Sequence, residues 1–499
     1  MPTIRNLDLK ILSAAWASLT AVLGISAGSI LGCSTAAAAA PTLQLEACRR
    51  DGVTARCGWW AVPEDPAAGT GKKLQLSVVV IPALRSRAEP DPLVILSGGP
   101  GQAASDFYAA VAPAFGRIRR DRDIVLIDQR GTGRSNRLDC EFSDDIDFGV
   151  TDLQQLQAQA RMCLGALPGD PRFYTTSVAV RDLDAVRAAL GYDKLNFYAV
   201  SYGTRVAQHY LRRFPSRVRS MVLDGAVPVN LALGPDAAPQ AQNALDSIFE
   251  RCLMEDGCRA AFPDLKDQFA NLRVQLQNAP LHMQVADPVS AEPTLTTFGV
   301  AQLSAAVRLL SYSDETASVL PLLIHEAQTR QQPQALIAQY LMIKHSTETQ
   351  IAYGMHFAVV CSEDAPRWPL QKISAATLAA SYMGEAFMQG LQTVCDAWPR
   401  GIVDDDFNAP LHSDVPALIL SGGNDPVTPR QYGERVLAGF SNGKHLVVAG
   451  QGHGQIGNGC MPRVVAQFIG GGSMQGVDTS CVTDISRTPF MLSRTATQP

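Results

Sequence analysis

The chain has 499 residues, of which 46% are hydrophobic and 18% charged, and its formal net charge is -5 at pH 7. This is the composition of a globular protein, long enough for one large domain with an insertion or for two or three domains. No basic stripe and no run rich in lysine and arginine stands out, so we expect no nucleic-acid partner.

The first forty residues have the pattern of an export signal. Arg5 and Lys10 precede a mostly apolar stretch that ends in small residues. That stretch is also just long enough for a membrane anchor. Two processing routes stay open: a lipobox-like sequence makes Cys33 the lipidated first residue, or a signal peptidase cuts within residues 36–40. We expect an exported protein, in a bacterial periplasm or lipid-anchored at the outer membrane, or alternatively secreted.

The cysteine content agrees with export. Of eleven cysteines, ten remain when Cys33 is set aside, and an even number suits an oxidising compartment. Cysteines close in sequence are Cys48 and Cys57, Cys140 and Cys163, Cys252 and Cys258, Cys361 and Cys395, and Cys460 and Cys481. Proximity suggests these five bridges, although the sequence does not fix the connectivity. No C-x-x-C or paired-histidine spacing occurs, so we expect no metal and no cofactor.

After Pro41, short apolar segments alternate with helical patterns. The predicted strands cover residues 58–63, 74–81, 93–96, 123–128, 195–200 and 218–223, and the predicted helices cover residues 178–190 and 202–214. This alternation predicts an α/β fold in which a mostly parallel sheet is covered on both faces.

The alternation stops near residue 227 and resumes with a strand near Pro416, a helix from about Pro429 and a strand over residues 445–449. The intervening segment has mostly helical patterns, which predicts a helical cap inserted above the sheet. The predicted organisation is a signal and tether over residues 1–40, a core in two parts over residues 41–226 and 401–499, and a cap over residues 227–400.

Ser201 stands at the junction of a predicted strand and a predicted helix. Ala199 and Gly203, two positions before and after it, are small, as a sharp backbone turn requires. The usual pattern, G-x-S-x-G, has glycine where this chain has Ala199. We predict a nucleophile elbow that exposes the serine hydroxyl; the alternative is a serine at an ordinary strand–helix junction.

A serine nucleophile needs a base, and the base needs a third group that orients it. His453, between glycines after a predicted strand, is the candidate base, and Asp425, after another strand, is the candidate acid. Each lies where open parallel sheets place their sites, and the order serine, acid, base is that of one known triad type. Asp224 is the rival acid; Asp425 is preferred because it lies between Ser201 and His453 in sequence.

Acyl transfer also requires donors for a developing oxyanion. The backbone N–H of Tyr202 is one candidate, because it follows the nucleophile. The glycine-rich loop over residues 98–101 offers the other, with Gly99 the preferred donor. A plain turn and a phosphate cradle are the alternatives, but no Lys-Ser/Thr follows, which excludes a P-loop.

Three motifs together resemble the proline iminopeptidase and tripeptidyl aminopeptidase family of α/β hydrolases. They are Gly98-Gly99-Pro100-Gly101, residues 128–135 (DQRGTGRS) and residues 201–205 (SYGTR), and the region from about Cys395 to Gly454 is similar to the family's TAP-like part. The resemblance implies the α/β-hydrolase fold and release of residues from the free N-terminus of peptides. Such an enzyme needs a carboxylate for the substrate ammonium group. Glu363 and Asp364 are the candidates, with a solvated acidic turn as the alternative.

We therefore predict an exported serine hydrolase, an aminopeptidase that acts through Ser201, His453 and Asp425 and an acyl-enzyme. Its partner would be a peptide or small ester substrate, with the membrane reached only through an anchor at Cys33. The alternatives are a carboxylesterase acting on small acyl esters and a non-catalytic binding lipoprotein.

Overall fold

The computed structural model describes residues 42–50, 52–68, 70–140, 152–369 and 374–496. The predicted export signal and Cys33 lie outside these residues. Within the described ranges, no helix combines the length and apolar character needed to cross a membrane.

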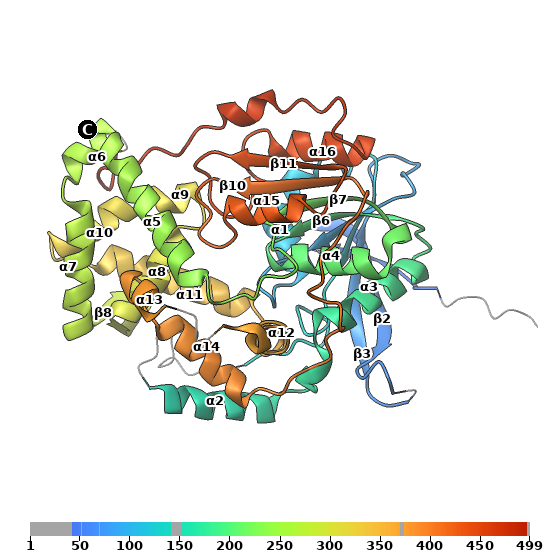
Figure 1. Cartoon of the computed structure of the whole chain (residues 1–499), viewed down its shortest axis with the longest axis horizontal. Coiled ribbons are helices and arrows are strands. Elements are labelled where there is room, and N and C mark those ends of the chain that lie inside the picture. Colours follow the sequence, from blue (N-terminus) through green and yellow to red (C-terminus); the bar gives the residue numbers. More distant parts are fainter. Residues whose placement is uncertain (1–41, 51, 69, 141–151, 370–373, 497–499) are drawn as a thin grey trace, which may run out of the picture. The chain divides into compact units, whose positions relative to one another are not determined.

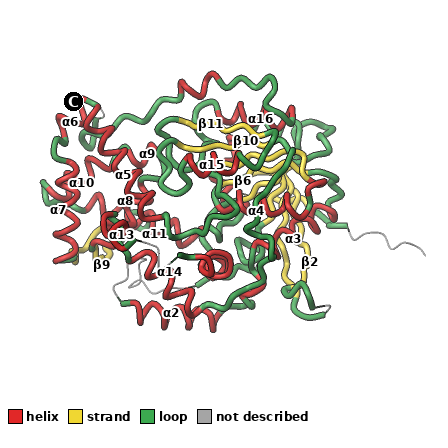
Figure 2. The backbone as a smooth tube through the Cα atoms, in the orientation of Figure 1, coloured by secondary structure: helices red, strands yellow, loops and turns green. Residues whose placement is uncertain are grey.

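A nine-stranded sheet forms the core, with the strand order β1-β2-β3-β5-β4-β6-β7-β10-β11. Figure 2 shows the strands in yellow among the red helices. The strands are β1 (Glu46–Arg50), β2 (Val53–Pro63), β3 (Lys73–Ile81), β4 (Leu93–Leu96), β5 (Ile124–Ile127), β6 (Leu195–Val200), β7 (Val218–Asp224), β10 (Ala417–Gly422) and β11 (Gly443–Val448). The pairs from β1 through β3 to β5 are antiparallel, whereas all pairs from β5 through β4 to β11 are parallel. The predicted fold class, an α/β-hydrolase fold with a mostly parallel sheet, is confirmed.

Both faces of this sheet are buried beneath helices, which explains why the central strands β4 and β5 are apolar at every position. On one face, Val94 and Leu96 of β4 share a core with helices α3, α4 and α15; on the other face, Leu93 and Ile95 pack with α1 and α16 (Figure 1). These helices are α1 (Ala104–Val111), α3 (Thr176–Ala189), α4 (Tyr202–Arg213), α15 (Arg430–Leu437) and α16 (Met461–Gly471).

The cap has a second hydrophobic core of its own. Its elements are α5 (Ala237–Met254), α6 (Asp256–Ala261), α7 (Leu265–Asn278), β8 (Leu281–Ala286), β9 (Pro293–Phe298), α8 (Val300–Leu310), α9 (Asp314–Ala317), α10 (Leu320–Gln328), α11 (Gln334–Gln350), α12 (Tyr353–Val359), α13 (Ala375–Ala380) and α14 (Ala386–Ala397). The antiparallel pair β8–β9 is an addition to the mostly helical segment that the sequence predicted. Val285 and Phe298 from this hairpin join the cap core, so it packs as part of the cap.

Two segments outside residues 227–400 also pack against the cap. Helix α2 (Leu153–Ala166) contacts α14 in a small apolar cluster. The chain after α16 returns to the cap, where Phe490 is buried in the cap core and Arg494 forms an ion pair with Glu326. The cap is therefore assembled from three separate stretches of sequence.

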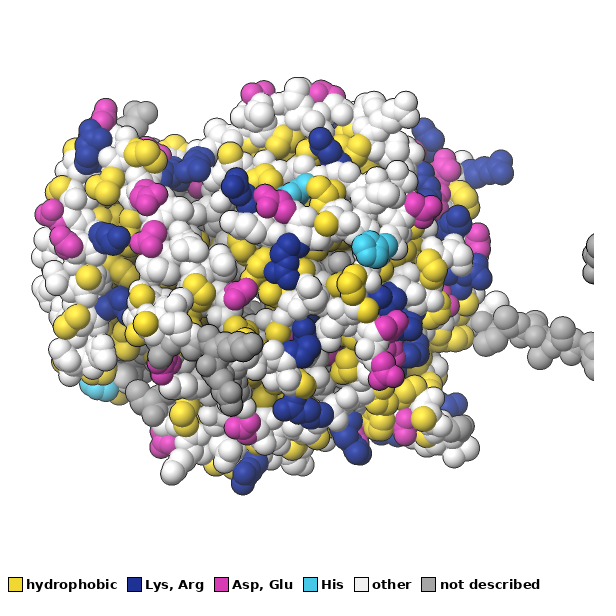
Figure 3. All heavy atoms as spheres, in the orientation of Figure 1, with side chains coloured by type: hydrophobic (Ala, Val, Ile, Leu, Met, Phe, Trp, Pro, Cys, Tyr) yellow, Lys and Arg dark blue, Asp and Glu magenta, His cyan; other side chains and the backbone are white. Residues whose placement is uncertain are grey.

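The five disulfides join the pairs that proximity suggested: Cys48–Cys57, Cys140–Cys163, Cys252–Cys258, Cys361–Cys395 and Cys460–Cys481. Such bridges form and persist in oxidising compartments. On the face drawn in Figure 3, basic and acidic side chains are interspersed.

Candidate active site

Ser201 occupies the sharp turn between β6 and α4. Its backbone has φ 56° and ψ -126°, a strained conformation for a residue with a side chain. A Cβ on Gly203 would lie 2.4 Å from the Leu96 carbonyl oxygen, and one on Gly98 would lie 3.1 Å from Ser201 Cβ. The turn therefore has no room for a side chain at Gly203, the neighbouring loop has little at Gly98, and Ser201 stands at the end of the strand.

His453 and Asp425 form a buried hydrogen-bonded pair. His453 Nδ1 donates to Asp425 Oδ2 at 2.8 Å, and the same carboxylate accepts from the backbone N–H groups of Val427 and Thr428 and from the Thr428 hydroxyl. Burial opposes charge on both groups, but their mutual attraction prevails. It raises the pKa of His453 and lowers that of Asp425 relative to their ordinary values. The imidazole is thus oriented by an ionised carboxylate.

Asp224, the rival acid, has a different set of partners. Its carboxylate accepts from the Tyr198 hydroxyl at 2.6 Å and from the backbone N–H groups of Gln455 and Ile456. Burial raises the pKa of Asp224 to about 6, although these hydrogen bonds oppose the shift. Asp224 therefore holds the loop after His453, whereas Asp425 binds the imidazole ring.

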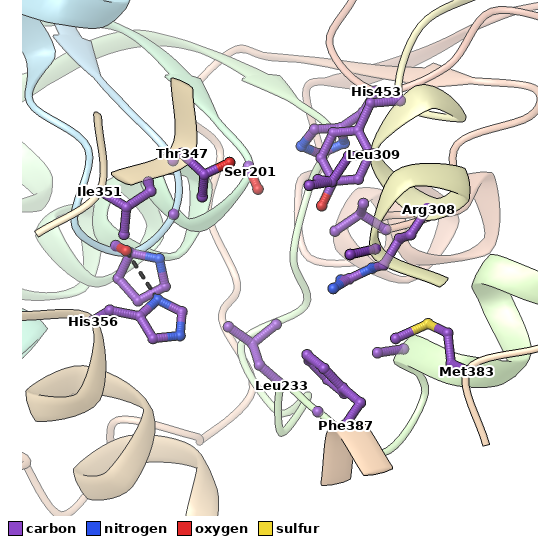
Figure 4. Close-up of a pocket in the computed structure, with 18 of the residues that line it drawn as sticks. Ser201, Leu233, Arg308, Leu309, Thr347, Ile351, His356, Met383, Phe387 and His453 are labelled. Atoms are coloured by element: carbon purple, nitrogen blue, oxygen red, sulfur yellow. Dashed lines mark hydrogen bonds between the residues drawn. The ribbon is translucent and has the colours of Figure 1, made fainter. Parts of the chain in front are cut away.

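Ser201 and His453 both line one cavity of about 1070 Å³ between the sheet and the cap (Figure 4). Within the described ranges, no hydrogen bond joins their side chains. Catalytic hydrogen bonds of this kind are often long without substrate and tighten in the complex. The cavity thus brings hydroxyl, imidazole and, behind the imidazole, carboxylate to one edge of the sheet.

The predicted oxyanion elements flank Ser201. Gly98 and Gly99 line the cavity. Tyr202 begins α4, and its hydroxyl is buried between Gln129 and Thr176, at 3.2 and 2.7 Å. The Tyr202 side chain is therefore anchored inside the core, which fixes the peptide group after Ser201.

Residues of the cap form hydrogen bonds with the glycine-rich loop. Ala352 N–H donates to the Gly101 carbonyl at 3.0 Å, and His356 Nδ1 donates to the Pro100 carbonyl at 3.0 Å (Figure 4). Gln102 Nε2 also donates to Gln350 Oε1 at 3.0 Å. Burial lowers the pKa of His356 to about 4, so its ring is neutral near pH 7. The position of this loop thus depends on cap residues far away in sequence.

Glu363 and Asp364 do not occupy the position predicted for them. Both lie in a buried π-helical turn, Val360–Asp364, with fully buried side chains, and neither lines the cavity. Asp364 pairs with Arg205 of α4 at 3.0 Å, and Glu363 accepts from the N–H and hydroxyl of Thr176. We correct the amine-binding prediction: these carboxylates connect the cap to α4 and are closed to a substrate ammonium group.

Three residues near the site had no assigned role in the sequence. Thr428 donates to Asp425, His356 holds the glycine-rich loop, and the Tyr312 carbonyl accepts from the backbone N–H of His453 at 2.6 Å. The turn over residues 425–428 could have been noticed, since an aspartate side chain commonly accepts from the backbone N–H groups that follow it. Tyr312 and His356 lie in the cap, and no local pattern ties them to the core.

Fold and site together define an α/β hydrolase. Residues 91–318 match the α/β hydrolase fold family, and residues 380–481 match the TAP-like protein family. The chain has the α/β-hydrolase fold and carries a TAP-like region, which confirms the resemblance found in its motifs.

Relatives with assigned names include peptidases and an esterase. The chain is 25% identical over 460 residues to serine protease Hip1 of Mycobacterium tuberculosis, covering 86% of this chain and 87% of that protein. It is 27% identical to carboxylesterase B of the same species, covering 86% of each. It is 34% identical to tripeptidyl aminopeptidase of Streptomyces lividans, covering 34% and 35%. The protein is therefore a hydrolase of a family that includes both peptidases and esterases.

Proposed function

We propose that this protein is an exported serine hydrolase that releases N-terminal residues or short peptides through Ser201, His453 and Asp425. The observation that carries the proposal is the oriented His453–Asp425 pair beside the strained Ser201 turn, with Ser201 and His453 open to one cavity. This combination supplies a nucleophile, a base and a group that holds the base.

In the proposed mechanism, Ser201 Oγ attacks the substrate carbonyl carbon while His453 accepts the hydroxyl proton. Asp425 stabilises the imidazolium that forms. The backbone N–H groups of Gly99 and Tyr202 donate to the oxyanion. The leaving amine departs with the proton from His453, and water then cleaves the ester to Ser201, returning a proton through His453.

The peptidase assignment draws support from the names of two relatives, Hip1 and tripeptidyl aminopeptidase. Asp236 and Glu385 line the cavity, and they replace Glu363 and Asp364 as candidate partners for a substrate ammonium group. The relative named carboxylesterase B favours a second candidate function, hydrolysis of small acyl esters. Five disulfides support export to an oxidising compartment.

A two-stage experiment tests the proposal. A fluorophosphonate probe should label the protein and fail to label Ser201→Ala. Aminoacyl, dipeptidyl and tripeptidyl amides are then compared with p-nitrophenyl esters. Turnover of esters without any amide turnover would favour the esterase. Absence of labelling in a folded protein would favour a binding lipoprotein and remove the catalytic proposal.

A further inference from the structure

The cavity that contains Ser201 and His453 is lined by charged side chains of both signs. They are Asp236, Glu385, Arg273 and Arg308. Asp236 accepts from the Tyr432 hydroxyl at 2.6 Å, Glu385 accepts from Gln389 at 3.0 Å, and Arg273 donates to the Ser381 carbonyl at 3.3 Å. Three of the four charged groups therefore already have a protein partner.

Arg308 differs from the other three because no hydrogen bond joins its guanidinium group to any residue that the structure describes, whereas Arg273, whose buried Nε is also without a partner, has its one bond to Ser381. In the part of the chain that the structure describes, no carboxylate forms an ion pair with its guanidinium group, and its buried Nε has no hydrogen-bond partner. An arginine presents five N–H donors and keeps its charge at all ordinary pH values. Leaving such donors without an acceptor at a partly buried site is unfavourable, so a ligand that supplies one would bind there.

Arg308 lines the same cavity as Ser201 and His453. The side chain extends from α8 into the cavity, between His453 and Phe387 in Figure 4. Its guanidinium carbon lies 4.9 Å from the centre of the Phe387 ring, which supports one face of the planar group and leaves its edge available. The positive charge of Arg308 also acts to lower the pKa of both His453 and His356, so its electrostatic effect reaches the candidate base and the residue that holds the glycine-rich loop.

We propose that Arg308 binds a carboxylate of the substrate, so that the preferred substrates are short peptides with a negative charge. The planar fork of arginine matches two carboxylate oxygens, and the contact would hold the peptide while its carbonyl lies at Ser201. The carboxylate could be the C-terminus of a short peptide or an acidic side chain, and the test below separates the two. The inference deepens the proposed function and rests on it for the identity of the reaction, but its test needs no turnover.

Binding to the Ser201→Ala protein provides that test. Calorimetry would compare trialanine, trialanine amide and the amide of alanyl-glutamyl-alanine. We expect at least one carboxylate peptide to bind about 10- to 100-fold more tightly than trialanine amide, as for a charge-assisted hydrogen-bond pair. A preference for trialanine indicates a C-terminal carboxylate, and a preference for the glutamyl peptide indicates a side chain.

Adding Arg308→Gln should reduce the carboxylate preference to within about threefold, while Arg308→Lys, which keeps the charge and loses the fork, should retain part of it. Arg330→Gln is the matched control, since it removes the same charge from an exposed cap position whose nearest carboxylate is Glu326. The preference should survive in the control, and thermal melting establishes that each variant is folded.

Equal binding of acid and amide, binding of none of the peptides, or a preference that survives Arg308→Gln would each overturn the inference. Loss of the preference in Arg273→Gln alone would overturn it in favour of the neighbouring cation. Because these measurements use an inactive serine variant, a failed probe-labelling experiment removes the catalytic proposal and leaves this one standing.

Discussion

His356 is the cap residue whose replacement most directly tests whether the cap positions the oxyanion loop. Its Nδ1–H donates to the Pro100 carbonyl at 3.0 Å, next to the proposed donor Gly99. In His356→Ala this hydrogen bond is lost, while Ala352 N–H still donates to Gly101 and Gln102 Nε2 still donates to Gln350. The loop should therefore shift without being released.

The expected fall in kcat follows from the loss of one of these three hydrogen bonds. Complete loss of an oxyanion donor costs about 10²–10³ in kcat. One of three supporting hydrogen bonds is worth about 1–2 kcal/mol, so kcat should fall about 5- to 30-fold. The KM value should change little, because the donor acts on charge that develops in the transition state. His356→Asn retains a side-chain N–H near the same place and should keep kcat within about threefold.

Steady-state kinetics on the best amide or ester substrate, with thermal melting of each variant, measures these effects. His345→Ala is the control, because His345 is exposed on α11 and should leave kcat unchanged. A rise in KM without a fall in kcat would refute the positioning role. So would equal losses in His356→Ala and His356→Asn at the same melting temperature.

Three further outcomes are expected. In Asp425→Asn, kcat should fall about 10³–10⁴-fold. The acid limb of the kcat/KM profile is set by the pKa of His453, which is raised above 6.5, and it should move to lower pH because the carboxylate that stabilises the imidazolium is gone. An acid limb at an unchanged pH would contradict the pairing of Asp425 with His453. Gly203→Ala places a Cβ 2.4 Å from the Leu96 carbonyl oxygen and should abolish probe labelling, whereas Gly165→Ala, with nothing within 4 Å, should not. Removing the Cys361–Cys395 disulfide, with a sequence separation of 34, should lower the free energy of unfolding by about 4 kcal/mol, because the unfolded chain gains entropy when the loop is opened. Removing Cys252–Cys258, with a separation of 6, opens a shorter loop and should cost about 2 kcal/mol. Denaturant titration that gives the reverse order would contradict this expectation.

The core was predictable because its information is local. Short apolar runs such as Leu93–Leu96, followed by glycine, serine or aspartate where the chain must turn, favour strands buried on both faces. Ser201, Asp425 and His453 stand at three such ends, so sequence order and strand polarity were enough to propose that they meet. The disulfide pairs were local as well, since none spans more than 34 residues.

The cap was predictable only as a helical insertion. Two adjacent acidic residues, Glu363 and Asp364, look the same in sequence whether they face a ligand or an arginine of the core. Their partner, Arg205, stands four positions after Ser201, and nothing in its local pattern shows that it is buried. The hairpin β8–β9 is a different case, because its first strand, LHMQVA, does alternate between inward and exposed residues, but its six residues were not separated from the helical patterns around them. The burial of Glu363 and Asp364 and the packing of β8 and β9 in the cap depend on contacts between segments that are not local in sequence.

The return of the chain to the cap affects how the molecule is completed during synthesis. Phe490 packs beneath Arg251, 4.1 Å from ring centre to guanidinium carbon, and Arg494 reaches Glu326. Phe490 and Arg494 follow every other cap residue in sequence, so they leave the ribosome after the rest of the cap. Until then Glu326 is uncovered on one side, so a nascent chain stalled near residue 480 would carry an unfinished cap above a complete sheet.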